Sequence, residues 1–434
     1  LVGADQRDEG WSVTAAGEEL AALGDTADLN VVGSVTQKLA HPHPRSYVGK
    51  GKLQEVADLV DDLQADVVVV DHELTPAQIR NIERALTVKI IDRPTLILDI
   101  FARHAMTHEG RLQVELAQLE YRLPRLTRMW THLSRQGVGG VGLRGPGETQ
   151  LEVDRRIAIN RVHQIKAELE AVHEHRERYR QRRRRNQIPV IAIVGYTNAG
   201  KSTLLNRLSN ADVLEEDKLF ATLDPTTRRV HLPGGLEVLL TDTVGFISNL
   251  PPTLIAAFRA TLEEIAEASV LLHVVDISNP SAAEHADTVL TILDELGVGD
   301  RPMIVALNKV DALEDASSLD LSWMGIDEPE DFVAVSARTG AGVDELLERV
   351  QTHVLTGRMF RKLDVLIPYD RSELVSLFHR TGEVESEEFG EHGTHLTGVL
   401  PTRVALRFAD FECSDSNGQF AEAATGSEQP LVSS

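Results

Sequence analysis

Residues 191–205 read IAIVGYTNAGKSTLL, and this stretch decides the fold of the chain. A β-branched apolar run leads into Gly195, four variable residues, Gly200, Lys201 and Ser202, and a helix-forming apolar run follows. In this strand-loop-helix setting, backbone N–H groups curl around a polyphosphate, Lys201 brings a positive charge to the β- and γ-phosphates, and Ser202 offers a hydroxyl to Mg²⁺. The setting disfavours the alternative of a simple glycine turn. We expect nucleotide contacts from Gly195, Tyr196, Thr197, Asn198, Ala199, Gly200, Lys201, Ser202 and Thr203.

The composition limits the class of protein. At 434 residues the chain can form several domains. It has no apolar run long enough for a membrane span, and its start, LVGADQRDEG, lacks the features of a signal peptide, so we expect a cytoplasmic protein. The single cysteine, Cys413, excludes a disulfide framework and a cysteine metal site. Because the chain opens at Leu1 on what looks like a shortened strand, we expect further residues to precede it.

Charge is distributed unevenly along the chain. The formal net charge of −23 by itself argues against a nucleic-acid partner. Residues 101–190, however, contain 18 Lys and Arg against 10 Asp and Glu, so a basic segment is embedded in an acidic protein. The acidity could also be an adaptation to salt or to solubility, without any partner.

Residues 1–108 alternate short apolar runs with amphipathic stretches, which predicts an N-terminal α/β domain with a small parallel sheet. The segment YVGKGK at 47–52 could hold a phosphate, but a turn before the helix from Leu53 is favoured because no preceding strand completes the motif. His41 and His43 are interpreted as loop residues rather than a metal pair, since no further ligand is near them in sequence. The alternating runs are LNVVGSV from Leu29, LQEVADLVDDL from Leu53, DVVVVD from Asp66, PAQIRNIERAL from Pro76 and VKIID from Val88.

Residues 109–187 predict a long antiparallel helical hairpin. Two sets of apolar residues recur at spacings of four and three, which places each set on one stripe of a helix. Pro124 should kink the first helix, and Thr149 with Glu152 predicts a capping box at the start of the second. The first set is Leu112, Leu116, Leu119, Leu123, Leu126, Trp130 and Leu133, and the second is Ala158, Val162, Ile165, Leu169 and Val172.

The tip of this hairpin and its basic end are candidate RNA-binding elements. The interruption at 136–147, QGVGGVGLRGPG, is half glycine, which permits close approach to a partner's backbone, although a flexible connector is the alternative. The second helix ends in HRERYRQRRRR, and its planar arginines suit phosphate better than a solvated linker face. Tyr179 is the one aromatic in this run, so base stacking has little support. We expect RNA contacts from Arg135, Gly137, Gly139, Gly140, Arg144, Arg182, Arg183, Arg184 and Arg185.

Residues 188–358 predict a doubly wound, mostly parallel sheet, with strands at 190–194, 238–241, 270–275, 303–307 and 332–335. Three further motifs follow strands in the order that a GTP site requires. The motif at 242–245 can hold Mg²⁺ through water and sense a γ-phosphate. The motif at 308–311 can accept from guanine N1 and its amine and so select GTP over ATP. The motif at 336–338 can offer backbone N–H groups to guanine O6. These motifs are Asp242, Thr243, Val244 and Gly245; Asn308, Lys309, Val310 and Asp311; and Ser336, Ala337 and Arg338.

The segment LFATLDPTTRR at 219–229 is the expected first switch, with nucleotide contacts from Phe220, Ala221, Thr222, Leu223 and Asp224. Thr222 is the first choice as a Mg²⁺ ligand beside Ser202, Thr226 is the second, and Asp242 would act through water. The expected catalytic residues are Lys201, Thr222 and Gly245. Phe246 and Ile247 stand where many switch GTPases place a water-orienting Gln. Because an apolar side chain cannot position water, we expect slow intrinsic hydrolysis that a partner stimulates.

Together these residues resemble the HflX-type family of GTPases, which are related to translation factors. The resemblance spans nearly the whole chain. Its most specific part is the glycine-rich stretch before GETQLE, and the family also carries an apolar residue after DTVG. The matching segments are YVGKGK, ELAQLEYRLPRL from Glu115, SRQGVGGVGLRGPGETQLEVDRR from Ser134, GYTNAGKSTLLN, FATLDPTTR, DTVGFI and NKVD.

The resemblance implies an N-terminal α/β domain with a helical hairpin, a central GTPase domain, and binding to the large ribosomal subunit and its rRNA. It further implies that the GTP-bound form dissociates or rescues stalled ribosomes or keeps subunits apart, that the ribosome stimulates hydrolysis, and that the hairpin tip approaches the peptidyl-transferase region. It also favours Thr222 as the switch threonine that joins Ser202 on Mg²⁺. We expect a monomer.

Two other functions stay open on the residues alone. A GTP-gated scaffold or assembly factor acting on another RNA or protein is the main alternative. A stand-alone metabolic nucleotide hydrolase is disfavoured because no second substrate pocket of acids or histidines can be discerned in the sequence.

Residues 359–411 predict a small α+β domain. Its expected elements are a strand at DVLIPY, a helix at RSELVSLFHRT and two strands at HLTGVL and RVALRF. Similar appendages occur in part of the family. The composition of residues 412–434 predicts a disordered tail.

Overall fold

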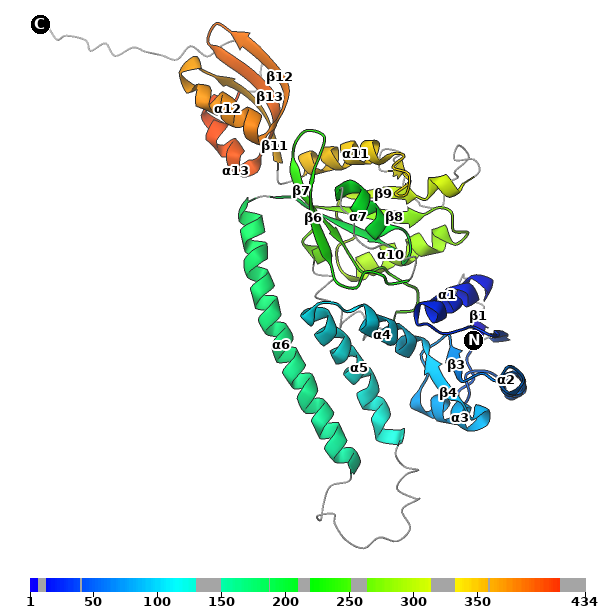
Figure 1. The fold of residues 1–434 in the computed structure, drawn as a ribbon. Helices are drawn as coiled ribbons and strands as arrows, with labels where there is room; N and C mark the ends of the chain where they lie inside the picture. The colour runs from blue at the N-terminus through cyan, green and yellow to red at the C-terminus, as the bar shows by residue number, and fades with distance from the viewer. Residues whose placement is uncertain are drawn as a thin grey trace, which may run out of the picture. The chain divides into compact units, whose positions relative to one another are not determined.

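The structure is a computed structural model that describes residues 1–6, 13–39, 41–129, 150–186, 188–209, 219–250, 264–313, 332–357 and 360–413. The chain forms two compact units, Leu1–Val354 and a C-terminal unit that begins at Leu355. The predicted fold class is confirmed: an N-terminal α/β part with a helical hairpin, a central mostly parallel sheet and a small antiparallel C-terminal sheet (Figure 1). The finer boundaries of the five predicted parts stay predictions. Within the described ranges, no helix combines the length and the apolar character of a membrane span.

The N-terminal part is built on a four-stranded parallel sheet with the order β2-β1-β3-β4. Local chemistry fixes where its helices begin: Thr75 and Gln78 form a reciprocal capping box on α3, and the Asp92 carboxylate accepts from the Thr95 N–H at the start of α4. The elements are β1 (Val2–Gln6), α1 (Val13–Thr26), β2 (Val35–Leu39), α2 (Lys50–Leu63), β3 (Val67–Val70), α3 (Pro76–Leu86), β4 (Lys89–Asp92) and α4 (Arg93–His104).

Two details of this part bear on the predictions. The apolar run from Leu29 does not itself form the strand, because β1 pairs with β2 from Val35 onward and leaves the Val32 side chain half exposed. The first half of YVGKGK forms the expected turn: Tyr47 has a φ of 64°, and Gly49 donates its N–H to Gln37 Oε1 at 2.9 Å. Residues 50–52 already belong to α2, which begins three residues before the expected Leu53.

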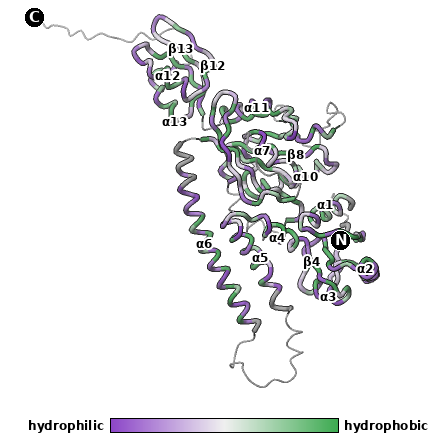
Figure 2. Tube along the Cα trace, viewed as in Figure 1, coloured by the Kyte–Doolittle hydropathy of each residue, from purple (hydrophilic) through white to green (hydrophobic). Residues whose placement is uncertain are grey.

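The hairpin consists of α5 (His108–Met129) and α6 (Gln150–Asn186), which lie side by side and antiparallel (Figure 1). The predicted seam forms, since Leu112, Leu116, Val162 and Ile165 are buried against one another. Figure 2 shows apolar residues recurring among hydrophilic ones along both helices. Ion pairs flank the seam, such as that between Arg161 Nε and Glu115 Oε1, which lie 2.7 Å apart. Part of the basic charge of this region is therefore neutralised locally.

Several predicted features of the hairpin lie outside the described residues. They are Trp130, Leu133, the capping residue Thr149, the glycine-rich tip at 136–147, and Arg135 and Arg144. The arginines at 182–185 fall at the end of α6, but their side chains are not among those described. The helix α5 continues past Pro124 to Met129. The kink, the capping box and the RNA contacts therefore stay predictions, as does the disordered tail predicted for 412–434, of which only Glu412 and Cys413 are described.

The central sheet has six strands in the order β10-β9-β8-β5-β7-β6. The five expected strands are present and pair in parallel. The edge strand β6 is antiparallel to β7 and was missed, because only Val230 of its TTRRVH segment is buried and no apolar alternation marks it. The elements are β5 (Val190–Gly195), α7 (Lys201–Ser209), β6 (Thr226–His231), β7 (Glu237–Asp242), β8 (Val270–Asp276), α10 (Ala282–Glu295), β9 (Met303–Asn308), the 3₁₀ turn η2 (Val310–Ala312), β10 (Phe332–Ala334) and α11 (Val343–Thr356).

The C-terminal unit contains a three-stranded antiparallel sheet with the order β11-β13-β12. The prediction of a strand at RVALRF is wrong. There Ala405 and Phe408 are buried while Leu406 is exposed, a spacing of three that suits a tight helical turn. The third strand is instead the polar segment EVESEEFG, whose exposed side chains gave no apolar signal. The elements are β11 (Phe360–Ile367), η6 (Tyr369–Arg371), α12 (Ser372–Thr381), β12 (Glu383–Gly390), β13 (Gly393–Pro401), α13 (Thr402–Ala405) and η7 (Leu406–Phe411).

Candidate functional site

The loop between β5 and α7 lines a cavity of about 420 Å³. Two glycines are required in this loop: Gly195 has a φ of 155° and Gly200 a φ of 93°, and a Cβ on either would collide with Val274 or Asn308. Lys201 is buried, and its ammonium donates to the Tyr196 carbonyl at 2.7 Å. Burial lowers the pKa of Lys201 to about 8, although the nearby Asp242 opposes this shift. The loop thus holds a desolvated cation, which an anionic ligand would stabilise.

Three oxygen-bearing side chains meet next to this lysine. Ser202 Oγ lies 2.7 Å from Thr222 Oγ1 and donates to Asp242 Oδ2 at 2.6 Å. Asp242 Oδ1 is buried and has no hydrogen-bond partner among the described residues. Burial raises the pKa of Asp242, and Lys201 opposes the shift. This set of hard oxygen donors fits Mg²⁺. Of the two threonines considered as ligands, Thr222 belongs to the set, whereas Thr226 is the first residue of strand β6.

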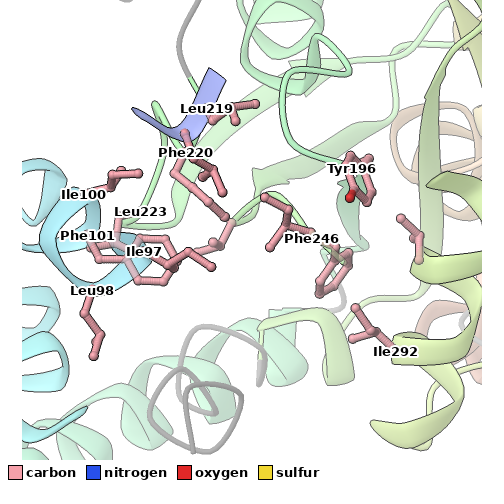
Figure 3. Packing of buried hydrophobic residues seen from close by; sticks show 14 of the residues in the cluster. Ile97, Leu98, Ile100, Phe101, Tyr196, Leu219, Phe220, Leu223, Phe246 and Ile292 are labelled. Atoms are coloured by element: carbon pink, nitrogen blue, oxygen red, sulfur yellow. The ribbon is translucent and has the colours of Figure 1, made fainter. Parts of the chain in front are cut away.

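The segment after Asp242 is fastened to the phosphate loop. Phe246 donates its N–H to the Gly195 carbonyl at 3.1 Å, and Thr197 donates its N–H to the Phe246 carbonyl at 2.8 Å. A Cβ on Gly245 would lie 2.9 Å from Thr197 Cα, so this close approach requires glycine. The Phe246 side chain is only 3% exposed and packs in the core (Figure 3). From this position no side chain reaches into the cavity to orient water.

The two base-recognition motifs, at 308–311 and 336–338, lie together at the carboxyl ends of β9 and β10. Asn308 bridges the loops, since its Nδ2 donates to the Ala199 carbonyl at 2.8 Å and its Oδ1 accepts from the Ala337 N–H at 3.0 Å. Asp311 accepts from Ser336 Oγ at 2.5 Å and forms an ion pair with Arg338. These contacts, that of Ser336 first, lower the pKa of Asp311. The carboxylate is therefore ionised, as an acceptor for guanine must be.

Other predicted residues serve the frame of the site. Lys309 has a φ of 68°, and its ammonium pairs with Asp276 at 2.7 Å. Thr243 Oγ1 donates to the Ile193 carbonyl at 2.7 Å, and Val244 belongs to the hydrophobic core. The predicted positions that line the cavity are Thr197, Asn198, Gly200, Lys201, Ser202, Thr203, Phe220, Ala221, Thr222, Leu223, Asp224, Asp242, Thr243 and Gly245.

The first switch segment is bound to the N-terminal part of the chain. The Phe220 ring packs edge-on against Phe101 of α4 with ring centroids 4.7 Å apart, and Leu223 lies in the same cluster (Figure 3). Asp224, predicted to contact nucleotide, accepts from the Met106 and Thr107 N–H groups at 2.9 and 2.8 Å and from Thr107 Oγ1. These groups immediately precede α5, so Asp224 holds the switch to the base of the hairpin.

A second polar contact joins the N-terminal part to the segment after Asp242. The guanidinium of Arg93, at the start of α4, is 2% exposed; it pairs with Glu19 and Asp71 and donates to the Ser248 carbonyl at 3.2 Å. The Tyr196 hydroxyl of the phosphate loop donates to Glu19 and accepts from the Ser248 N–H at 2.8 Å. Burial and then the Glu19 charge raise the pKa of Tyr196.

Sequence reasoning missed these supporting residues. His104, Met106 and Thr107 also line the cavity, although they belong to the N-terminal part. Arg207 of α7 donates from Nε to the Ala337 carbonyl at 3.1 Å and so holds the guanine loop. No short motif marks any of them, because each acts across a distance of many residues in sequence.

The geometry can be compared with known proteins. Family models match residues 14–102 (GTP-binding GTPase N-terminal), 104–183 (GTP-binding GTPase Middle Region), 190–309 (50S ribosome-binding GTPase) and 325–419 (HflX C-terminal domain). The GTPase HflX of Lacrimispora saccharolytica is 47% identical over 399 residues, covering 91% of each chain. That of Escherichia coli is 45% identical over 381 residues, covering 87% of each chain. A crystal structure of SsGBP in complex with GDP is 27% identical, covers 81% of this chain and 96% of that chain, and has a TM-score of 0.46.

A phosphate loop with its switch segments and guanine motifs in this order, on a doubly wound sheet, defines a P-loop GTPase. The match extends well beyond that sheet, into the N-terminal part and the hairpin region. The chain belongs to the HflX family of GTPases.

Proposed function

We propose that this GTPase binds the large ribosomal subunit and its rRNA through the hairpin, and that GTP binding and hydrolysis control ribosome dissociation, rescue or anti-association. The observation that carries the proposal is the attachment of the first switch to the start of α5 by Asp224. A segment that senses nucleotide is thereby bonded to the hairpin it would control. The description of the matching central domain as 50S ribosome-binding supports the choice of partner, and a ribosomal partner would place the protein in the cytoplasm.

Mg²⁺ is the proposed cofactor, with Ser202 and Thr222 as direct ligands and Asp242 acting through water. The contacts among these three side chains and the unpartnered Asp242 Oδ1 support this assignment. When bound, Mg²⁺ would neutralise charge on the β- and γ-phosphates. Lys201 would bind the same phosphates, and the Gly245 N–H would sense the γ-phosphate. Asp311 would select guanine, and Arg338 would move away from its carboxylate when the base enters.

Partner-stimulated hydrolysis follows from the position of Phe246. Its side chain is buried in the core, so it cannot orient the attacking water. We expect the bare protein to hydrolyse GTP slowly and to be stimulated by the large subunit.

Sedimentation with ribosomal subunits tests the proposal. A GTP analogue should increase pelleting with the large subunit relative to GDP, and deletion of residues 136–147 should abolish the increase, whereas deletion of residues 414–434 should not. Equal pelleting in all nucleotide states would refute the proposal. The alternative, a GTP-gated scaffold for another RNA or protein, would be favoured if the deletion of 136–147 left the partner and the function intact.

A further inference from the structure

A second group of metal-type donors lies in the C-terminal unit, away from the nucleotide motifs in sequence. Asp364 is on β11, His395 is on β13, and Cys413 follows η7. Their donor atoms all lie within 4.8 Å of one another, and His395 Nε2 is 2.5 Å from Asp364 Oδ1. Over the described part of the chain, this is the one place where three His, Cys, Asp or Glu side chains converge so closely.

Strand register explains the convergence. Asp364 pairs with Thr397, and His395 pairs with Leu366, so Asp364 and His395 are diagonal neighbours on one face of the sheet. That face is the solvent side, because the alternate residues, such as Val365 and Leu396, are fully buried on the other.

Cys413 reaches the same face from the far edge of β11. Val365 forms a β-bridge with Glu412, and the Cys413 N–H donates to the Asp364 carbonyl at 2.9 Å. The three donors thus come from three adjacent extended segments whose backbone is already hydrogen-bonded. Side-chain rotations can therefore adjust the donor positions without breaking these backbone bonds.

We propose that Asp364, His395 Nε2 and Cys413 Sγ bind one Zn²⁺ ion, with solvent in the fourth position. An imidazole nitrogen, a thiolate and a carboxylate are the donors that Zn²⁺ takes, whereas Mg²⁺ prefers oxygen alone. Bonds of about 2.0–2.3 Å in a tetrahedral site require donors roughly 3.3–3.8 Å apart. His395 Nε2 and Asp364 Oδ1, now 2.5 Å apart, would move apart to admit the ion, and donor pairs that lie further apart, all within 4.8 Å, would close on it. The ion would replace the direct hydrogen bond between His395 and Asp364.

The exposure of the donors permits exchange with solvent. The Asp364 side chain is 52% exposed, that of His395 is 35% exposed, and Cys413 is also exposed. A bound ion would link Cys413 to both β11 and β13 and so add a side-chain connection to the backbone pairing that already covers this edge of β11. The proposed site goes against the expectation that a single cysteine excludes a cysteine metal site, because strand pairing brings His395 and Asp364 to the thiol as further ligands.

Cobalt substitution tests the site directly in the full-length protein. Protein free of transition metals is saturated with Mg²⁺ and GDP, so that the nucleotide site is filled, and Co²⁺ is then titrated. A thiolate-to-cobalt charge-transfer band can arise only from Cys413, since the chain has one cysteine. We expect one equivalent to bind, Zn²⁺ to displace it, and alkylation of the thiol to slow about tenfold or more with Zn²⁺ and to recover with a chelator.

Matched variants separate the site from adventitious binding. His395→Asn removes a direct ligand and should weaken Co²⁺ binding by about 100-fold or more, beyond the loss typical of a residue that only supports a ligand. His379→Asn, which changes an exposed histidine paired with Glu387 in the same unit, should leave binding unchanged. Absence of the band, or an alkylation rate of the wild-type thiol that Zn²⁺ does not alter, would overturn the proposal without relying on any variant. So would a His395→Asn protein that binds Co²⁺ as tightly as the wild type.

Discussion

The bond between the first switch and the hairpin base can be cut by one substitution, Asp224→Ala. It removes three hydrogen bonds: two from the backbone N–H groups of Met106 and Thr107, and one from Thr107 Oγ1. Hydrogen bonds to a charged group contribute about 1.5–3 kcal/mol each at most, and less where solvent competes, so we expect a total loss of about 1.5–2 kcal/mol. Asp224 is two residues from Thr222, so this energy helps to hold Thr222 beside Ser202.

The loss should appear as reduced preference for GTP over GDP. Only the γ-phosphate state requires Thr222 at the metal, so the affinity for a GTP analogue should fall by about 10- to 30-fold, while that for GDP should stay within about twofold. Titration with fluorescent analogues of both nucleotides in Mg²⁺ measures the two constants. Thr107→Val, which removes one of the three bonds, should cost about threefold, and Asp99→Ala, an exposed carboxylate paired with Arg103, should cost nothing. Equal losses for GTP and GDP, or none, would refute the reasoning.

Three further perturbations test other parts of the site. The pKa of Lys201 is about 8 in the folded protein and higher in the unfolded chain, so the protein should gain stability as the pH rises from about 8 towards 10.5. Nucleotide affinity needs the Lys201 ammonium, so it should fall by up to about tenfold per pH unit above 8. Binding titrations across this range should show the fall, and Lys201→Arg should flatten it. Asp311→Asn should shift base preference from guanine towards xanthine in competition binding, and an unchanged preference would remove Asp311 from base recognition. Arg93→Met should lower the free energy of unfolding by about 3–5 kcal/mol in denaturant titrations, because Glu19 and Asp71 lose their buried partner. Arg103→Met, which breaks an exposed ion pair with Asp28, should lower it by less than about 1 kcal/mol. Equal effects of the two substitutions would contradict the assigned burial.

The parts of the fold that the sequence predicts are those where side chains repeat with the period of the backbone. The buried strand β5 is apolar throughout, and the seam at Leu112 and Leu116 recurs at helical spacing. The strands β6 and β12 are held by backbone pairing at sheet edges, so their exposed polar side chains carry no such period. The segment RVALRF alternates like a strand, but burial at a spacing of three makes it helical.

The site divides in the same way. The residues of the phosphate loop, of the motif at 242–245 and of the two guanine motifs are each close in sequence, and their chemistry is local, so their spacing predicts them. The positions of Arg93, His104 and Arg207 depend on which surfaces meet after folding, and no local pattern encodes that. Asp224 shows the limit clearly: it lines the cavity, as its sequence neighbours suggest, but nothing local indicates that its carboxylate also accepts from the backbone before α5.

The attachment of residues 219–224 at both ends affects how the protein can be divided for study. The Leu219 N–H donates to Thr26 Oγ1 of α1, Phe220 packs on Phe101 of α4, and Asp224 is held before α5. A fragment that begins at residue 188 would therefore lack three anchors of its own nucleotide switch. Rates measured on such a fragment would report a different enzyme, and subtracting them from those of the full chain would not isolate the contribution of the N-terminal part.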